Sequence, residues 1–428
     1  MTSLLRAFAF LLAAGFLLAQ EAKAESLYVK TGTLIDVVAG RAVSNQCVAV
    51  DGERIKSVGN CGTPPKGARV IDWHKYTVLP GLIDLHTHLA DVETSADVAA
   101  PLNTSLSDTV ALGAAHALQT VMAGFTSVRD VGTYRGLSDV ILRDEINDGT
   151  YVGPRMMVAG AYLTKPGGGG ELNGLPKGTE IPLDLRLGVA DTPAKIAKRA
   201  EFLISNGADF LKLIATGAVL AIGTEPGQQE LSEAMMRAAV RVAAKHGTYA
   251  TAHAHGAAGI KAAIRAGVRS IEHASLIDLE GLTMAKAKGV WLVMDIYNGD
   301  YIDEVGTREK WPAEYLRKNR ETTDLQRQGF TRAVQMGVKL GYGTDAGVYP
   351  HGDNGKQFAY MVKYGMTPMQ AIQSATIEAA TLMSRTDKVG SIAPGLFADM
   401  IAVDGDPLIN IRILEKVAHV MKGGALVK

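Results

Sequence analysis

The chain has 428 residues, of which 47% are apolar and 21% are charged, as in an ordinary globular protein. Lysine plus arginine and aspartate plus glutamate each number 44. This balance gives no electrostatic basis for binding nucleic acid or an anionic membrane, so we expect neither partner.

Residues 1–24 have the pattern of a secretory signal peptide. Arg6 is the only charge before a long apolar stretch, and an Ala-Lys-Ala sequence typical of a cleavage site ends at Ala24. The alternative is a membrane anchor, but the stretch is shorter than the ~20 residues that span a bilayer. We therefore predict export to the periplasm or the medium, cleavage near Ala24, and no membrane span in the mature chain.

Residues 25–79 form the first part of a predicted small β domain. Short strand-like runs alternate with turns, and Asp51-Gly52 is a strong hairpin signal. Cys47 and Cys61 both lie in this region. Export permits a disulfide between them, and two unpaired thiols are an equal alternative.

From residue 80 to residue 387, strand-like and helical segments alternate, which predicts a parallel sheet. We expect strands near 82–88, 125–130, 155–160, 209–215, 248–253, 270–273, 291–294 and 338–345. We expect helices near 107–123, 194–206, 230–246, 256–267, 279–288, 313–336 and 367–383. Glycine follows six of these helices, where its left-handed conformation ends a helix well: Gly124, Gly207, Gly247, Gly267, Gly289 and Gly337. Eight strands alternating with helices predict a (β/α)8 TIM-like barrel with its active site at the carboxyl ends of the strands.

The tail, residues 388–428, returns to a strand-like pattern. We expect it to join residues 25–79 in a small flanking β-sandwich formed from both chain ends. Residues 161–190 break the alternation and contain the run Gly167–Gly170. The run lacks the lysine and hydroxyl residue of a phosphate-binding loop, so we expect a loop over the barrel mouth.

His86 and His88 end the first barrel strand. Side chains two positions apart on a strand share a face, so both should point toward the barrel axis. Two buried imidazoles side by side usually share a metal ion. The alternative is a hydrogen-bonded pair of core histidines.

Lys212 lies within the buried fourth strand, 209–215. A buried ammonium group is costly unless it is paired, and it tends to lose its proton. A neutral lysine can react with carbon dioxide to give a carbamate, which is able to bridge two metal ions. The alternative is a lysine in an ion pair or one that reaches the rim.

Two further segments place histidines at strand ends. His253 and His255 share a face, so one could bind metal while the other contacts or orients the substrate. His273 ends the sixth strand. Glu272 precedes it and is expected to point the other way.

Asp345 ends the eighth strand, where a carboxylate can bind metal and accept a proton. The alternative is an ordinary helix-capping aspartate. His351 follows on the same loop and is a candidate for substrate contact. The other histidines of the mature chain are expected to be packing or surface residues: His74, His116, His246 and His419.

In this order, the motifs resemble the amidohydrolase superfamily over nearly the whole mature chain. The family pattern Pro-Gly-x-Ile-Asp-x-His-x-His stands at residues 80–88. Residues 123–133 and 343–355 are similar to the imidazolonepropionase-like and prolidase-like branch. The resemblance implies a distorted barrel, a flanking β-sandwich and two divalent ions, usually zinc.

The resemblance also implies roles for individual residues. His86, His88 and Asp345 would hold one metal ion, and His253 and His273 would hold the other. Lys212, as N6-carboxylysine, would bridge both ions. Asp345 and His255 would be catalytic, with Asp345 carrying a proton to the leaving amine and His255 bonding the carbonyl oxygen. His255 and His351 would contact the substrate.

The branch includes dipeptidases that release a C-terminal amino acid and amidohydrolases that cleave ochratoxin A. We therefore expect a small-molecule substrate, a dipeptide or N-acyl amino acid, and we expect homo-oligomerisation from the branch alone.

A lactonase or cyclic-amide hydrolase is the main alternative. Imidazolonepropionase itself usually carries one metal and lacks the bridging lysine, so the presence of Lys212 argues against that activity. A non-catalytic scaffold is disfavoured because the ligand set is complete. A periplasmic binding protein is disfavoured because two lobes are lacking.

Overall fold

The computed structural model describes residues 26–428. The predicted signal peptide, residues 1–24, lies outside the described residues. Within residues 26–428, none of the helices combines the length and the apolar character that a membrane span requires.

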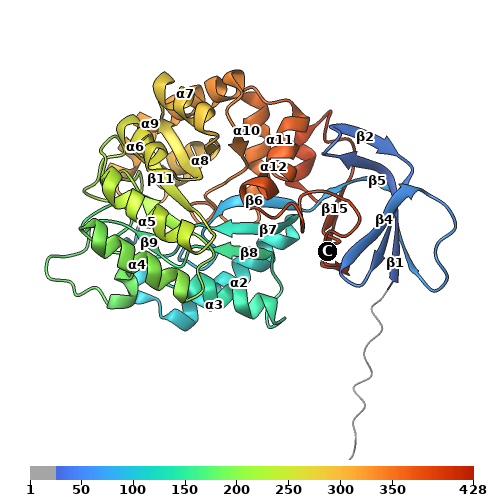
Figure 1. The fold of residues 1–428 in the computed structure, drawn as a ribbon, viewed down its shortest axis with the longest axis horizontal. Coiled ribbons are helices and arrows are strands. Elements are labelled where there is room, and N and C mark those ends of the chain that lie inside the picture. Colours follow the sequence, from blue (N-terminus) through green and yellow to red (C-terminus); the bar gives the residue numbers. More distant parts are fainter. Residues whose placement is uncertain (1–25) are drawn as a thin grey trace, which may run out of the picture.

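Strands from both chain ends lie together at one end of the molecule, the blue and red elements of Figure 1. They form one eight-stranded sheet in the order β17-β16-β15-β5-β1-β3-β4, with β2 beside β1. The strands are β1 (Ser26–Asp36), β2 (Arg41–Ser44), β3 (Gln46–Asp51), β4 (Arg54–Asn60), β5 (Arg69–Pro80), β15 (Met400–Val403), β16 (His419–Lys422) and β17 (Ala425–Leu426).

Both chain ends contribute strands to this domain, as the sequence predicts. The strands form a single sheet, however, and not the two facing sheets of the predicted β-sandwich. The 12-residue strand β5 pairs with β1 on one side and with β15 on the other, so it links the N-terminal and C-terminal strands directly. The sheet also curves back on itself, because Ile55 N donates to Leu396 O at 2.9 Å and Ala398 N to Glu53 O at 2.8 Å. A separate apolar core fills the curve.

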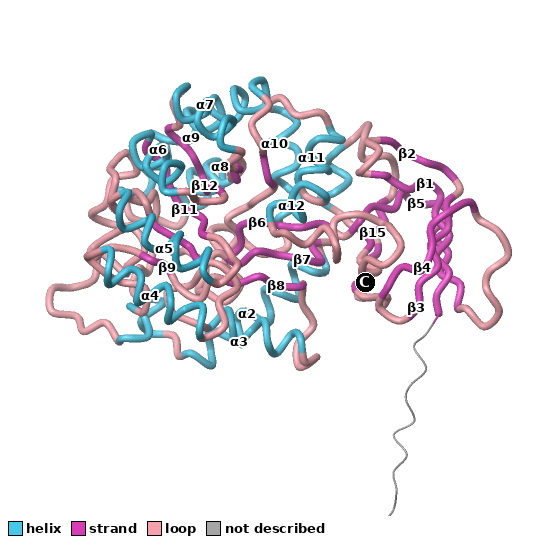
Figure 2. The backbone as a smooth tube through the Cα atoms, in the orientation of Figure 1, coloured by secondary structure: helices cyan, strands magenta, loops and turns pink. Residues whose placement is uncertain are grey.

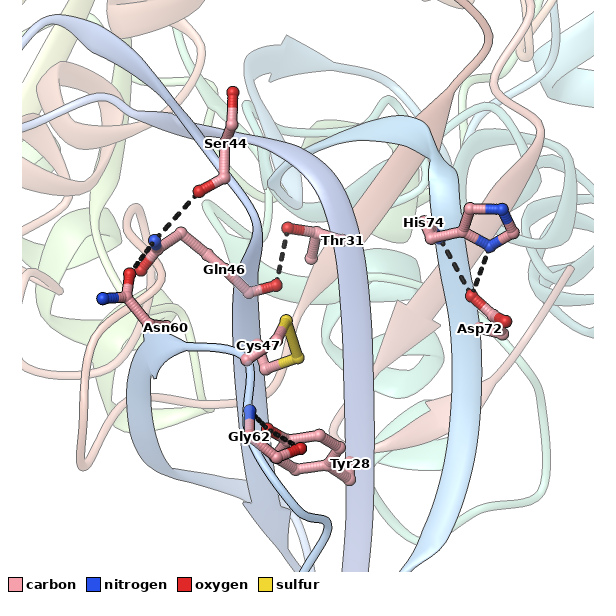
Figure 3. The surroundings of a disulfide bond; sticks show 10 residues. Tyr28, Thr31, Ser44, Gln46, Cys47, Asn60, Gly62, Asp72 and His74 are labelled. Carbon is pink, nitrogen blue, oxygen red and sulfur yellow. Dashed lines mark hydrogen bonds and ion pairs between the residues drawn. A yellow bond between two sulfur atoms is a disulfide. The ribbon is translucent and has the colours of Figure 1, made fainter.

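Cys47 and Cys61 form a disulfide in this sheet, which decides between the two alternatives that the sequence leaves open. Cys47 lies on β3, and Cys61 directly follows β4, its antiparallel neighbour. Figure 3 shows the bond beside Tyr28, whose hydroxyl accepts a hydrogen bond from Gly62 N at 2.9 Å. The disulfide therefore ties the end of β4 to the sheet.

Reduction of this disulfide is expected to lower the free energy of unfolding of the β domain by about 2–4 kcal/mol, because the bond closes a loop of 14 residues. Chemical denaturation with and without a reductant would measure the change. The Cys47→Ala/Cys61→Ala double variant is the control and should not respond to reductant. A wild-type curve that ignores the reductant would contradict the prediction.

The rest of the described chain contains nine parallel strands with helices around them (Figure 2). A three-stranded sheet is formed by β6 (Leu82–Thr87), β7 (Phe125–Asp130) and β8 (Arg155–Val158). A six-stranded sheet is formed by β9 (Tyr162–Leu163), β10 (Leu211–Ile214), β11 (Ala250–Gly256), β12 (Ser270–Leu276), β13 (Trp291–Val293) and β14 (Leu340–Gly341).

The helices follow these strands along the chain. They are α1 (Ala100–Asn103), α2 (Leu106–Met122), α3 (Ser138–Asn147), α4 (Pro193–Ser205), α5 (Glu233–Lys245), α6 (Ala257–Ala266), α7 (Leu279–Lys288), α8 (Asn298–Arg308), α9 (Ala313–Met336), α10 (Gln357–Lys363), α11 (Pro368–Ser374) and α12 (Ile377–Leu382). Short 3-10 turns lie at Leu183–Arg186, Asn354–Lys356 and Ile411–Glu415.

The two parallel sheets contact each other at both edges through backbone hydrogen bonds. At one seam Leu85 N donates to Tyr342 O at 2.9 Å, and Asp345 N donates to His86 O at 2.8 Å. At the other seam Asp209 N donates to Val158 O at 2.8 Å. The carboxyl ends of β6 and β14 are therefore adjacent.

All six glycines predicted to end helices have positive φ angles, between 66° and 102°, so this prediction is confirmed. The predicted helix 367–383 is wrong, because the chain forms two helices, α11 and α12, separated at Thr376. The Thr376 hydroxyl donates to Ile372 O at 2.7 Å, and the backbone there leaves the helical conformation. Helices α1, α3, α8 and α10 were not predicted.

Candidate active site

A pocket opens where the carboxyl ends of the parallel strands meet. Its empty space, the open mouth included, is about 980 Å³, within the range of small-molecule sites. Seven of the eight site residues predicted from the sequence line it: His86, His88, Lys212, His253, His255, His273 and Asp345. Strand periodicity explains the placing of Lys212, because Leu211 and Leu213 pack in the core while Lys212 and Ile214 face the pocket.

Potential metal-ligating atoms gather in two adjacent groups that share His273. One group is His86, His273 and Asp345, the other is His253, His255 and His273, and the ligand atoms of each lie within 4.8 Å of one another. Asp345 Oδ1 is 3.2 Å from both His86 Nε2 and His88 Nε2. This spacing fits side chains that converge on a cation.

Three of the histidines have one ring nitrogen fixed by a hydrogen-bond acceptor of the protein. The Nδ1–H of His86 donates to Glu272 at 3.0 Å, that of His88 to Gly132 O at 2.9 Å, and that of His273 to Asp295 at 3.0 Å. Metal-binding histidines are oriented in this way, which leaves the other nitrogen as the ligand. His86 Nε2 is buried and makes no hydrogen bond, so its lone pair is available to a metal ion.

His253 and His255 lie on β11 with their ring centres 4.6 Å apart. His255 Nδ1 is 2.8 Å from the Ser275 hydroxyl, and His253 Nε2 is 3.3 Å from Gly217 O. Burial, and then the neighbouring His273, lower the pKa of both rings, that of His255 to about 3. Both imidazoles are therefore neutral at pH 7 and able to bind a cation.

Two site residues have unusual backbone conformations. His273 has a φ of 67°, Ala274 follows with 51°, and Asp345 has 61°. A non-glycine residue in this region costs about 1–3 kcal/mol, and such strain collects at active sites. The turn at His273 also ends the strand alternation, so Glu272 and His273 both approach His86. Glu272 does not line the pocket, whereas His273 does, in agreement with the prediction that Glu272 points the other way.

Glu272 belongs to a fully buried ion pair with Arg129 below the pocket. Arg129 Nη2 donates to Glu272 Oε1 at 2.7 Å, and both side chains have no exposed area. Burial alone would raise the pKa of Glu272, but Arg129 and then His86 hold it well below its usual range. The ionised Glu272 thus fixes the ring of His86.

Lys212 is almost completely buried in the floor of the pocket. Among residues 26–428, no side chain or carbonyl forms a hydrogen bond or ion pair with its amine. Burial lowers the pKa of Lys212 to about 8, although the charges of Glu272 and Asp345 act in the opposite direction. The neutral amine that carbamate formation requires is therefore far more abundant near physiological pH than for an exposed lysine.

Comparison with known proteins agrees with this geometry. The profile of the amidohydrolase family matches residues 77–427. The chain belongs to the amidohydrolase family. Ochratoxinase of Aspergillus niger is 30% identical over 418 residues, which cover 91% of this chain and 84% of the relative.

Solved structures of amidohydrolases have the same fold over 94% of this chain. A Xaa-Pro dipeptidase with bound methionine is 35% identical, with a TM-score of 0.87 and 99% of that chain covered. A prolidase complexed with N-methylphosphonate-L-proline is 28% identical, with a TM-score of 0.88 and 99% coverage. The A. niger ochratoxinase structure is 29% identical, with a TM-score of 0.84 and 95% coverage. The resemblance to the prolidase-like branch is confirmed.

One predicted site residue of this amidohydrolase does not line the pocket. His351 is buried, and its ring stacks on that of His116 at 4.4 Å. Its Nδ1 lies 3.5 Å from the Thr120 hydroxyl of α2. His351 is therefore placed behind the pocket wall, and this geometry does not favour substrate contact.

Several pocket residues were missed: Asp91, Tyr134, Tyr162, Asp295 and Asn298. Asp295 closely follows β13, so the rule that selected Asp345 could have found it. Burial alone would raise the pKa of Asp345, but His86 holds it well below its usual range. Asn298 Nδ2 donates to Asp345 Oδ2 at 3.0 Å, which leaves Oδ1 of the ionised carboxylate facing the histidines.

Proposed function

We propose that this amidohydrolase uses two divalent metal ions to hydrolyse an amide bond and release a C-terminal amino acid from a dipeptide or an N-acyl amino acid. The observation that carries the proposal is the set of three histidines, each fixed at Nδ1, that present Nε2 to one pocket together with Asp345 and a buried, unpaired lysine. The similarity to a Xaa-Pro dipeptidase and to ochratoxinase supports the substrate class.

In this proposal His86, His88 and Asp345 hold one ion, and His253 and His273 hold the other. Imidazole nitrogen and carboxylate oxygen are donors that suit zinc, which is our first candidate. The neutral amine of Lys212 would add to carbon dioxide with loss of a proton, and the resulting carbamate would supply further oxygen ligands to the ions. When bound, the ions polarise the scissile carbonyl and make water a nucleophile near neutral pH.

The chain's own residues supply proton transfer and orientation. The ionised Asp345 accepts a proton from the attacking water and delivers it to the leaving nitrogen, a step that amides need because an amine anion leaves poorly. His255, fixed by Ser275, donates a hydrogen bond to the carbonyl oxygen as negative charge develops there.

The proposal also covers the architecture and the compartment. We treat the two parallel sheets as one closed (β/α)8 barrel, which the backbone hydrogen bonds at both seams support. We place the mature chain in the periplasm or outside the cell. The disulfide between Cys47 and Cys61 supports an oxidising compartment.

The test combines metal analysis with a substrate panel. Elemental mass spectrometry of the purified mature protein should find about two divalent ions per chain. The panel should contain dipeptides, N-acyl amino acids, ochratoxin A, lactones and a cyclic amide, and we expect the amides with a free carboxylate to be cleaved. Chelation should abolish the activity and added metal should restore it. Cleavage of lactones alone would favour a lactonase, and one ion per chain would favour a mononuclear hydrolase.

Activation of the metal-free protein by zinc and carbon dioxide is expected to be faster at pH 8 than at pH 6.5. Burial disfavours the ammonium form of Lys212, so its pKa falls to about 8, and the neutral fraction is about one half at pH 8 but about one thirtieth at pH 6.5. With dissolved carbon dioxide held constant, the activation rate should therefore rise about tenfold or more. The Lys212→Ala variant is the control, and a rate independent of pH in the wild type would contradict the prediction.

A further inference from the structure

A second buried lysine, outside the metal-ligand groups, contacts a loop that forms one wall of the pocket. Lys318 lies within α9 and has no exposed area. Its amine donates to Ala221 O at 2.5 Å and to Thr224 O at 2.7 Å, and it lies 2.8 Å from Glu314 Oε1. A buried ammonium is costly unless it is fully paired, so these contacts fix the loop to the helix.

The loop, residues 217–226, follows β10 and contains no helix or strand. Two further contacts join it to α9. Glu314 accepts a hydrogen bond from Gly223 N at 2.9 Å, and Arg317 pairs with Glu225 at 2.7 Å on the surface. A loop with few backbone hydrogen bonds of its own depends on such contacts for its position.

The inner side of the loop is apolar and faces the pocket through Ala218, Val219 and Leu220. Leu220 also packs against an apolar cluster that contains Ile302 and Val348, two other pocket residues. The loop therefore forms an apolar side of the pocket through Ala218, Val219 and Leu220, while its first residue, Gly217, contacts His253 through its carbonyl.

We propose that Lys318 is a positioning residue that sets the specificity of this amidohydrolase, because it holds the wall against which a large apolar group of the substrate packs. The proposal rests on the amide-hydrolase function proposed above. A loosened wall should weaken binding of substrates with a bulky apolar group, whereas substrates with a small acyl group should be cleaved as before. The metal-ligating side chains are on other elements, so metal content should not change.

The experiment compares wild type with Lys318→Met, which keeps the length of the side chain and removes the charge. Hydrogen–deuterium exchange should become at least about tenfold faster in the peptide covering residues 217–226, and not in β10 or β11. KM should rise about tenfold for an N-acyl amino acid with a long or aromatic acyl group. For the N-acetyl analogue, KM and kcat should both remain within about twofold of wild type.

Two further variants serve as a control and as a substitute for Lys318→Met. Arg317→Met removes the surface ion pair with Glu225 and should change loop exchange and KM less than about twofold, because exposed ion pairs contribute little. Thr224→Val removes the hydrogen bond from Ala218 N to the Thr224 hydroxyl, 3.2 Å long, without altering α9. It should shift exchange and KM in the same direction as Lys318→Met, and it replaces that variant if Lys318→Met does not fold.

A lower melting temperature with unchanged loop exchange and unchanged KM ratios would overturn the proposal, because Lys318 would then only stabilise the fold. Equal KM increases for small and large acyl groups would overturn the specificity role. If wild type cleaves no amide on the panel, the proposed function fails, and the exchange measurement still decides whether Lys318 holds the wall.

Discussion

Replacement of Lys212 by alanine is expected to remove at least one metal ion per chain and to lower kcat/KM by a factor of about 1,000 or more. The side chain is buried in the pocket floor and makes no hydrogen bond or ion pair with residues 26–428, so the fold does not need its charge. Loss of the amine should therefore act on the metal centre, and the cost in stability should come only from the space that the lost methylene groups leave. Elemental mass spectrometry and steady-state kinetics of the same preparation would measure both effects.

The matched control is Ile214→Val, on the same strand and the same pocket face. It removes one methylene group and should cost about 0.5–1.5 kcal/mol of stability without loss of metal. If Lys212→Ala retains two ions and wild-type turnover, the bridging role is wrong. If Lys212→Ala and wild type both bind one ion per chain, a mononuclear centre becomes the better interpretation.

The sequence predicts those site residues that follow regular periodicity. His86 and His88 are two apart on a strand, and Lys212 alternates with core leucines, so period two places them correctly. The glycines that follow six of the helices likewise mark a left-handed conformation that the local sequence predicts.

Periodicity fails where the backbone is irregular or where the partner is distant in sequence. The positive φ of His273 ends the regular alternation of β12, so Glu272 and His273 both approach His86, and no pattern in the residues around His273 signals that turn. The pairing of Glu272 with Arg129 joins strands 143 residues apart, which a single sequence does not encode locally. His351 was chosen for its nearness to Asp345 along the chain, but the loop turns its ring toward α2.

Replacement of Asp345 by asparagine is expected to lower kcat by a factor of about 100 to 10,000, with a smaller change in KM. Asparagine keeps the shape of the side chain, but it cannot accept a proton and binds a cation more weakly. Wild-type Asp345 is ionised because His86 holds its pKa low, and Asn298 orients its second oxygen. The Asn298→Ala variant is the control for orientation alone and should cost about tenfold.

Asp345 has two proposed roles, as metal ligand and as proton carrier. Substrates with different leaving groups distinguish the two roles. An amide nitrogen must be protonated before it leaves, whereas an ester oxygen leaves with much less help. If proton delivery is the main role, Asp345→Asn should lose far more activity on an N-acyl amino acid than on the ester analogue of the same shape. If the ligand role dominates, both substrates should lose activity equally and elemental analysis should show missing metal. Wild-type turnover of the amide by Asp345→Asn would assign proton delivery to another group. Asp295 would be the next residue to test, because Asn298 Nδ2 also donates to Asp295 Oδ2, at 3.1 Å.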